Sequence, residues 1–358
     1  MRTVFVREPK GNWRKLQIDD SEHFESGREG TIYATPNGEL ALKLFHESDI
    51  ALLRPRHKKI KAMLDDKFVS YFVEEREHPD FAWPICTIHS EQNDESFLGF
   101  GMKNLFGYHS LEILLTPTDK RYSNFSEFQR ALICSYLSYL FAVCHSRNVI
   151  IGDVKPDNIC VQPDGYHVAI IDCDSFQFSL NGIEYTTNVG THEYASPRLI
   201  QISKSNPGVL NLDKVHREFS DDTFALAILC FRLLMDGYHP FQTTKANKYK
   251  AKVFDNIQNR IFPYSGGVIR PPKNAPTSKY ESLPYEVQSL FEGAFKNAEY
   301  VSAARWRDVF YNYAKSLDEP KPVLTVIEQA QAAYPPALAR RSQREGFWSR
   351  VRKFLVRP

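Results

Sequence analysis

Two carboxylates, an amide and a lysine lie close together in one part of the chain. Asp153, Lys155 and Asn158 belong to the segment IGDVKPDN, and Asp172 follows Asn158 by fourteen residues. A carboxylate can orient an attacking hydroxyl group, oxygen ligands can hold Mg²⁺ against phosphates, and a lysine can offset the charge of a transferred phosphoryl group. Polar residues that only cap turns are the alternative, but the combination of all four argues against it. The segment therefore predicts phosphoryl transfer.

Short apolar runs flank these residues and are expected to position them. NVII precedes the polar segment, ICV follows it, and VAIID ends at Asp172. Runs of this kind, separated by polar turns, are typical of strands, with a further turn at residues 163–165. The four side chains would then emerge at the rim of a small hairpin and face one point.

A second set of candidate residues lies near the N-terminus. Gly27 and Gly30 stand in GREGTIY, and Lys43 lies thirteen residues after Gly30 inside the apolar run LALKLF. Glycines let backbone N–H groups approach phosphate oxygens, and a lysine adds a point charge. Two glycines alone are weak evidence, because G-x-x-G is common in turns. Lys43 carries the prediction, since a lysine within an apolar strand is expected to point into a cleft.

The hydrophobic pattern changes along the chain. Residues 1–106 consist mainly of short apolar runs typical of an antiparallel sheet, with one basic helical segment at 49–64 that Pro55 is expected to break or to delay. After residue 110 the period becomes helical. The predicted helices cover residues 126–145, capped by Ser126, residues 221–235, ended by Gly237 and Pro240, and residues 284–297 and 305–316.

The order of these motifs resembles the protein kinase superfamily over about residues 20–316. Asp153, Lys155 and Asn158 match the catalytic loop D-x-K-P-x-N, and Asp172 matches the metal-binding aspartate that opens the activation segment. Further matches follow in the family's order: GTHEYASP at 190–197, Asp222 before FALA, His239-Pro240-Phe241, and Arg305 near the end of the fold. Upstream, residues 27–33 resemble the glycine-rich loop, although Glu25 replaces its first glycine, and Lys43 resembles the strand lysine.

The resemblance implies an α+β, bilobal protein kinase-like fold. Residues 1–106 would form the β-rich N-lobe, residues 107–316 the helical C-lobe, and residues 317–358 a proline-containing linker and basic tail. It implies an ATP- and Mg²⁺-dependent serine/threonine protein kinase, since a lysine two residues after the catalytic aspartate resembles that branch. Asp153 would orient the substrate hydroxyl, Lys155 would stabilise the γ-phosphate, and Asn158 and Asp172 would hold magnesium. The implied nucleotide-binding residues are Gly27, Gly30, Ile32, Lys43, Met102, Lys103 and Leu105, with Met102 behind the adenine and the hinge at 103–105.

Four departures from the family pattern modify these expectations. Gly152 stands where many kinases have the arginine that pairs with an activation-segment phosphate, so activity is expected not to depend on that phosphate. Asp174 replaces the glycine after Asp172, which disfavours the usual flip of this segment. Arg198 replaces a glutamate, so Arg305 needs another partner.

The fourth departure concerns the helix after Lys43, which normally presents a glutamate to it. No acid lies between Ile50 and Leu64, whereas five residues there are basic. Glu47, Asp65 or Glu74 could substitute, or the pair is absent. The run IDCDSFQ also resembles an atypical bacterial subgroup often encoded beside von Willebrand-type proteins and metal-dependent phosphatases, which are the implied partners.

Composition narrows the remaining possibilities. The 358 residues carry a net charge of +2, but residues 335–358 hold seven Lys and Arg against one Glu, so residues 1–334 sum to −4 and give no sign of nucleic-acid binding. Six scattered cysteines predict free thiols in a reducing cytoplasm. The absence of a long apolar run or signal peptide agrees with this location. The tail reads either as an amphipathic helix for an anionic membrane or partner, or as a solvated end or a helix folded onto the C-lobe.

Two other functions remain open on the sequence. A pseudokinase would keep the fold and lose turnover, and the four departures motivate it, although Lys43, Asp153, Asn158 and Asp172 are all present. A small-molecule kinase of the aminoglycoside or choline type would share the Asp–Asn–Asp set. Lys155-Pro156 and the GT-Y-P segment argue against the second alternative.

Overall fold

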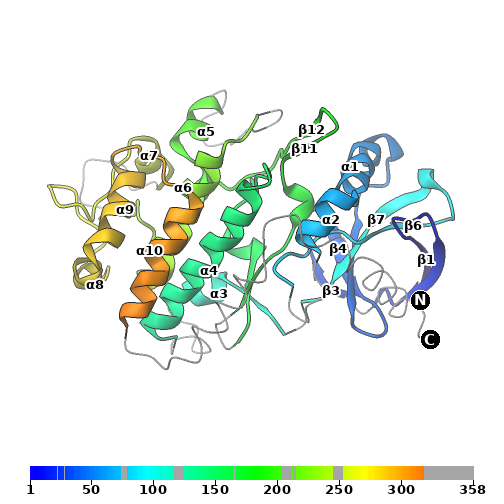
Figure 1. Cartoon of the computed structure of the whole chain (residues 1–358), viewed down its shortest axis with the longest axis horizontal. Coiled ribbons are helices and arrows are strands. Elements are labelled where there is room, and N and C mark those ends of the chain that lie inside the picture. Colours follow the sequence, from blue (N-terminus) through cyan, green and yellow to red (C-terminus); the bar gives the residue numbers. More distant parts are fainter. Residues whose placement is uncertain are drawn as a thin grey trace. The chain divides into compact units, whose positions relative to one another are not determined.

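The computed structural model describes residues 1–21, 23–27, 29–73, 79–105, 107–116, 125–163, 167–203, 212, 215–244 and 253–317 (Figure 1). Its described residues fall into two compact units. The first unit comprises Met1–Gly107 and Ala169–Asp174, and the second comprises Tyr108–Val168 and the residues from Ser175 onward. Of the linker and tail predicted at residues 317–358, residues 318–358 lie outside the described part of the chain.

A seven-stranded antiparallel sheet forms most of the first unit, in the order β2-β1-β6-β7-β5-β4-β3. Valine, isoleucine and leucine side chains from one face of this sheet form a core that includes Val4, Leu42, Leu44 and Ile88. The antiparallel sheet predicted for this part of the sequence is confirmed. Its strands are β1 (Arg2–Arg7), β2 (Trp13–Ile18), β3 (His23–Ser26), β4 (Gly30–Ala34), β5 (Leu40–Phe45), β6 (Cys86–His89) and β7 (Phe97–Lys103).

Two helices and a short 3-10 turn, η1 (Asp94–Ser96), complete the main chain of the first unit. Helix α1 (Ile50–Met63) begins at Asp49, whose side chain accepts from the N–H of Ala51, and it continues through Pro55. The expected break or delayed start at Pro55 is therefore wrong. Pro55 is the sixth residue of the helix, so α1 continues although it lacks one main-chain hydrogen bond there, and the packing of His57 on Phe97 helps to hold it together. Helix α2 (Asp66–Phe72) follows and packs Phe72 on the Trp83 ring, with centroids 4.3 Å apart.

The segment 169–174 attaches to the first unit through main-chain hydrogen bonds. The N–H of Ala82 donates to Ile170 at 2.9 Å, and the N–H of Ile170 donates to Asp80 at 2.9 Å. The chain then turns through the 3-10 helix η3 (Cys173–Ser175). This pairing fixes the backbone just before Asp172, which has a φ of +58°.

Helices dominate the second unit. Ser126 caps α4, as the sequence predicted, and Gln129 completes a capping box with it. Helix α6 is buried almost all round, and α10 packs along α4 (Figure 1). The four helices predicted from the sequence are confirmed within a few residues. The helices are α3 (Glu112–Leu115), α4 (Glu127–His145), α5 (Pro197–Ile202), α6 (Phe219–Leu234), α7 (Val253–Gln258), α8 (Thr277–Ser282), α9 (Tyr285–Phe295) and α10 (Ala303–Ser316).

Short strands and turns carry the polar segments of the second unit. The predicted strand NVII is wrong, because only Ile150 pairs there, exchanging two main-chain bonds of 2.7 and 2.8 Å with Gln177. The predicted strands ICV and VAII correspond to β9 and β10, while most of the expected turn at 163–165 lies outside the described residues. These elements are β8 (His109–Ser110), η2 (Pro156–Asn158), β9 (Ile159–Val161), β10 (Val168–Ile170), β11 (Phe178–Leu180), β12 (Ile183–Tyr185) and η4 (His192–Tyr194). The last two residues of β10 belong to the first unit.

Two further expectations concern the whole chain. All six cysteines are free thiols, five of them buried and Cys160 partly buried, which confirms the prediction of unpaired cysteines. Among the described residues, no helix is both long enough and apolar enough to cross a membrane.

Candidate active site

The Asp153 carboxylate is held by three neighbours in the second unit. Asn158 donates its side-chain N–H to the main-chain carbonyl of Asp153 at 2.8 Å and to its Oδ2 at 3.1 Å. The Lys155 Nζ lies 3.1 Å from the same oxygen, and the Thr191 hydroxyl donates to Oδ1 at 3.3 Å. Asp153 is only 4% exposed, so these bonds orient a largely desolvated carboxylate. The structure thus brings together three of the residues selected from the sequence and adds Thr191, which was not selected.

Asp222 fixes the loop that carries Asp153. Its Oδ2 accepts the N–H of Ile151 at 2.8 Å, and its Oδ1 accepts the N–H of Gly152 at 2.9 Å. The His145 Nε2 lies 3.1 Å from Oδ2. Asp222 is 1% exposed and lies in the first turn of α6, where the helix dipole favours a carboxylate. Breaking these bonds would leave a buried charge without its donors.

Gly152 is required by the backbone next to Asp153. Its φ of +79° is a conformation that other residues rarely adopt, and a Cβ added there would lie 2.5 Å from Cγ2 of Thr187. The arginine found at this position in many kinases has no room for even its first side-chain atom. The departure noted in the sequence is therefore built into the packing of the loop.

Within the second unit, the buried Arg217 holds the part of the activation segment that includes Gln177 and Val189. The Arg217 Nη2 donates to the carbonyl of Val189 at 2.6 Å, and its main chain exchanges bonds of 3.0 and 3.1 Å with the Gln177 side chain. Burial lowers the pKa of Arg217, and the carboxylates of Asp221 and Asp222 oppose this shift. The segment leading to Thr191 is thus anchored by a side chain that needs no phosphate.

Arg198 also reverses a charge of the family pattern. It pairs with Asp221 and, at 3.2 Å, with Glu218 at the start of α6. Asp221 also accepts the Ser196 hydroxyl. Arg305, by contrast, is exposed and makes no side-chain ion pair with the described residues. The contact usually made by a glutamate with a late arginine is replaced by an arginine with acids of α6.

Lys43 lies in the first unit between two aspartates. Its Nζ donates to Asp172 and to both carboxylate oxygens of Asp174, at 2.9 and 3.0 Å. The Lys43 and Asp174 side chains are 8% and 9% exposed. Burial alone would lower the pKa of Lys43, but Asp174 and Asp172 together raise it above its ordinary value. Lys43 therefore stays charged in an apolar strand because two carboxylates compensate it.

These contacts show which acid pairs with Lys43 in place of the glutamate that is absent from the following helix. Of the substitutes considered, Glu47 accepts from the N–H of Asp49, Asp65 caps α2, and Glu74 lies outside the described residues. Lys43 takes part in neither of these contacts. Asp174 is the acid that pairs with Lys43, although from the sequence it was noted only as a replacement for a glycine. Its φ is not positive, whereas that of Asp172 is, so the segment does not need a glycine at 174.

The two glycines form the tight turn between β3 and β4. The N–H of Gly27 donates to the carbonyl of Gly30 at 3.0 Å. A Cβ on Gly30 would lie 2.5 Å from the carbonyl oxygen of Leu44, so this close approach of two strands requires glycine. Ile32 follows on β4 and pairs with Lys43 on β5. The predicted loop and the predicted lysine are thus adjacent in one sheet.

The other predicted nucleotide contacts lie at the end of β7. Met102 is 6% exposed and pairs with Ala41 of β5, and Lys103 ends the strand. Lys103 and Leu105 are half-buried. Asn104, between them, donates its N–H to Glu39 at 3.0 Å. Met102 is thus a buried residue of the sheet, and residues 103–105, where the hinge was expected, lie at and just after the end of β7.

The donor set suits magnesium. The Asn158 nitrogen serves Asp153, which leaves its amide oxygen as the ligand atom, and the Asp172 carboxylate is 30% exposed. Amide and carboxylate oxygens are hard ligands that Mg²⁺ prefers. Asn158 belongs to the second unit and Asp172 to the first, and each is compatible with the role inferred from the sequence.

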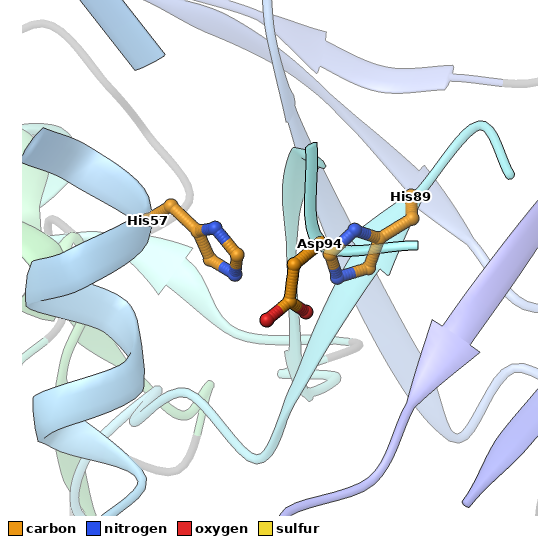
Figure 2. Close-up of side chains that lie close together, drawn as sticks. All are labelled: His57, His89 and Asp94. Carbon is orange, nitrogen blue, oxygen red and sulfur yellow. The ribbon is translucent and has the colours of Figure 1, made fainter. Parts of the chain in front are cut away.

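A second cluster of metal-ligand types has a different role. His57 of α1, His89 of β6 and Asp94 of η1 bring one ligand atom each within 4.8 Å of the others (Figure 2). Arg7 and Lys61 already pair with the two Asp94 oxygens, which leaves a net positive charge that would repel a divalent ion. The His57 ring stacks on Phe97 with centroids 4.3 Å apart. The cluster packs α1 onto the sheet.

Comparisons with known proteins identify the family of this chain. The protein kinase domain, as a family model, matches residues 102–300, more than half of the chain. The chain belongs to the protein kinase family, and its α+β architecture is that of the kinase fold.

Individual relatives are distant in sequence. Protein kinase YegI of Escherichia coli K12 is 24% identical over 322 residues, which cover 87% of this chain and 46% of YegI. Human serine/threonine-protein kinase MRCK gamma is 26% identical over 209 residues, 56% of this chain and 12% of that protein. The yeast cAMP-dependent protein kinase type 3 is 29% identical over 134 residues, 37% of this chain and 28% of that kinase. The chain spans about half the length of YegI and less of the other two.

Three residues of the site were not assigned these contacts from the sequence. Thr191 was noted only as part of a family motif, Asp174 only as a departure, and Arg217 not at all. The apolar run ending in Asp172-Cys173-Asp174 could have suggested a second carboxylate near Lys43. No sequence signal distinguishes Arg217 from a surface arginine.

Proposed function

We propose that this chain is an ATP- and Mg²⁺-dependent serine/threonine protein kinase that transfers the γ-phosphoryl group to a protein hydroxyl. The observation that carries the proposal is the Asp153 carboxylate, held by Asn158, Lys155 and Thr191 on a loop fixed by Asp222. Phosphoryl transfer depends mainly on positioning and charge stabilisation, and this arrangement supplies both.

Each side chain has a definite task in the proposed reaction. Asp153 accepts a hydrogen bond from the substrate hydroxyl and orients its oxygen toward the phosphorus. Lys155 stabilises the charge that develops on the transferred group. Lys43 binds phosphate oxygens, and the backbone N–H groups of the turn at residues 27–30 approach the same triphosphate. Met102, Lys103 and Leu105 would contact the adenine.

Magnesium would be held by Asn158 and Asp172. When bound, it neutralises phosphate charge and orients the leaving group. Until then, Asp172 is compensated by Lys43, so the lysine also keeps a carboxylate in place for the ion.

The Thr191–Asp153 bond favours a serine or threonine acceptor. It places the GT motif of the activation segment against the catalytic carboxylate, and Lys155 occupies the position typical of that branch. A small-molecule kinase does not need such a segment. A pseudokinase would keep ATP binding without transfer and is the alternative that the departures favour.

Activity is proposed not to require a phosphate on the activation segment. Gly152 leaves no side chain there to bind one, and Arg217 holds Val189 directly.

The location and partners are also proposals. The free thiols and the use of ATP favour the cytoplasm. A von Willebrand-type protein and a metal-dependent phosphatase are proposed as partners from the motif resemblance, and the basic tail as a membrane or partner contact.

One experiment separates the three functions. The full chain is incubated with γ-labelled ATP, Mg²⁺ and either generic protein or small hydroxylated acceptors, with Asp153→Ala as control. Label on protein that depends on Asp153 supports the proposal. Transfer only to a small acceptor supports the second function, and ATP binding without transfer identifies a pseudokinase.

A further inference from the structure

Helix α1 offers no carboxylate to Lys43. Its sequence, IALLRPRHKKIKAM, has no acid, and its side chains include Arg56, Lys58, Lys59 and Lys61. In kinases an acid of this helix normally holds the strand lysine, and the pair must form for activity. Here Asp174 supplies the carboxylate from the segment after Asp172. A link between this basic helix and Lys43 therefore needs a carboxylate from another segment of the chain.

The orientation of α1 is set on two sides. The His57 ring is directed from α1 toward Asp94 and His89 and stacks on Phe97, while Lys61 pairs with Asp94 at 3.1 Å (Figure 2). Arg56 lies with its guanidinium 4.8 Å from the centre of the Phe45 ring and pairs with Glu29 at 2.9 Å. These contacts prevent the helix from rotating freely.

Arg56 shows which part of α1 faces the Lys43 site. The Lys43 Nζ lies 5.8 Å from the centre of the same Phe45 ring. Lys59 is three residues after Arg56, so the two side chains leave the helix only about 60° apart. Lys59 is half-buried, whereas Lys58 is exposed. Arg56 and Lys59 therefore form one basic edge of α1, and Arg56 places that edge at the Phe45 ring, which Lys43 also approaches.

Electrostatics agree with this placement. Burial lowers the pKa of Lys59 to about 8, while Asp174 and Asp172 work against that shift. A half-buried lysine is tolerated near a second buried lysine only if carboxylates lie between or beside them.

We propose that Asp174 and Lys59 are positioning residues, with Asp174 bridging Lys43 of β5 to Lys59 of α1. The usual helix carboxylate and strand lysine are replaced by a lysine on the helix and a carboxylate between the two cations. The position of α1 then controls Lys43 through Asp174, and the segment after Asp172 becomes part of that link. The inference rests on the proposed function, because it assigns the regulation of the same site.

A charge exchange tests the bridge. Asp174→Gly and Lys59→Glu are each expected to lower kcat/KM for ATP by about tenfold or more, because each removes one member of the bridge. The double variant is expected to recover at least about fivefold over the product of the single effects, because Glu at 59 can then face Lys43. Asp174→Gly with Lys58→Glu is the matched control, since it adds the same charge at an exposed position and should recover nothing. Multiplicative effects in the double variant, or equal recovery with Lys58→Glu, would overturn the proposal.

A double-mutant cycle with less disruptive substitutions tests the bridge without requiring phosphoryl transfer. Lys59→Gln, Asp174→Asn and the double variant are unfolded with denaturant, and their unfolding equilibrium constants are compared. We expect the two changes to depart from additivity by at least about twofold, as residues in one ion-pair network do. Additive effects contradict the bridge even if phosphoryl transfer is observed. Absence of transfer by the wild-type chain contradicts the proposed function but leaves this cycle readable.

Discussion

Asn158 donates its side-chain amide to Asp153 twice, to the main-chain carbonyl at 2.8 Å and to the carboxylate at 3.1 Å. The two bonds close a small ring that sets the rotamer of a carboxylate with little access to water. They also commit the nitrogen of Asn158, so that its oxygen remains for a cation. One contact therefore links the proposed catalytic residue to the proposed metal ligand.

Asp222→Asn should weaken both the fold and the reaction. The amide nitrogen would face the donors at Ile151 and Gly152, leaving at least one buried N–H without an acceptor, at a cost of about 1–3 kcal/mol. Urea denaturation measures this loss, and Asp308→Asn on the exposed face of α10 is the control, expected within about 0.5 kcal/mol of wild type. Equal stability of the two variants would contradict the role given to Asp222.

Gly152→Ala should destabilise more than Gly182→Ala. Both glycines have left-handed φ values, +79° and +77°, but a Cβ at 182 meets nothing within 4 Å. Gly182→Ala thus measures the backbone strain alone, about 1–2 kcal/mol, and Gly152→Ala adds the clash with Thr187. Denaturation midpoints of the two variants provide the comparison. A smaller loss at 152 than at 182 would show that the loop relaxes freely.

Phosphatase treatment should leave the activity unchanged. Arg217 anchors Val189 through a neutral carbonyl, and Gly152 cannot bind a phosphate. The measurement compares initial rates of phosphoryl transfer before and after complete dephosphorylation, verified by mass spectrometry. A loss of activity that returns with autophosphorylation would contradict this account of the activation segment.

The free energy of unfolding should fall as the pH drops from about 6.5 to 4. Burial lowers the pKa of both His57 and His89 to about 4. The charge of Arg7 adds to both shifts, that of Lys61 adds to the shift of His57, and Asp94 opposes both. Unfolded histidine titrates near pH 6.5, so in this window the unfolded chain binds more protons and stability is lost as pH falls, by up to about 3 kcal/mol per histidine.

His57→Phe isolates this effect. Phenylalanine can still stack on Phe97, and the His57 Nε2 has no hydrogen-bond partner among the described residues, so little else changes. The variant should lose less stability than wild type between pH 6.5 and 4, while differing little in slope above pH 7. Identical pH profiles would show that His57 titrates normally in the folded chain.

Local sequence signals predicted much of this structure. Ser126 begins α4 because its hydroxyl can accept a helix N–H, and the apolar run of α6 allows only a buried helix. Asp153, Lys155 and Asn158 lie close together in the sequence, so their spacing alone was enough to predict that their side chains belong to one site. Each of these predictions depends on residues close together in the sequence.

Contacts between distant residues were not predictable in this way. Lys43 and Asp174 are 131 positions apart, and Thr191 is 38 positions from Asp153. Which acid compensates a lysine depends on the tertiary fold, and a glycine pattern suggested only that Asp174 was unusual. Pro55 was also misjudged, because packing of His57 on Phe97 helps to hold α1 together around it.

The most direct test of the central claim is the rate of γ-phosphoryl transfer by Asp153→Asn beside the wild-type chain. The amide keeps the size of the side chain but cannot accept the substrate proton in the same way, so we expect a fall in kcat of at least about 100-fold. ATP–Mg²⁺ binding, measured on the same samples, should change little. Transfer by Asp153→Asn at a rate close to wild type would contradict the account.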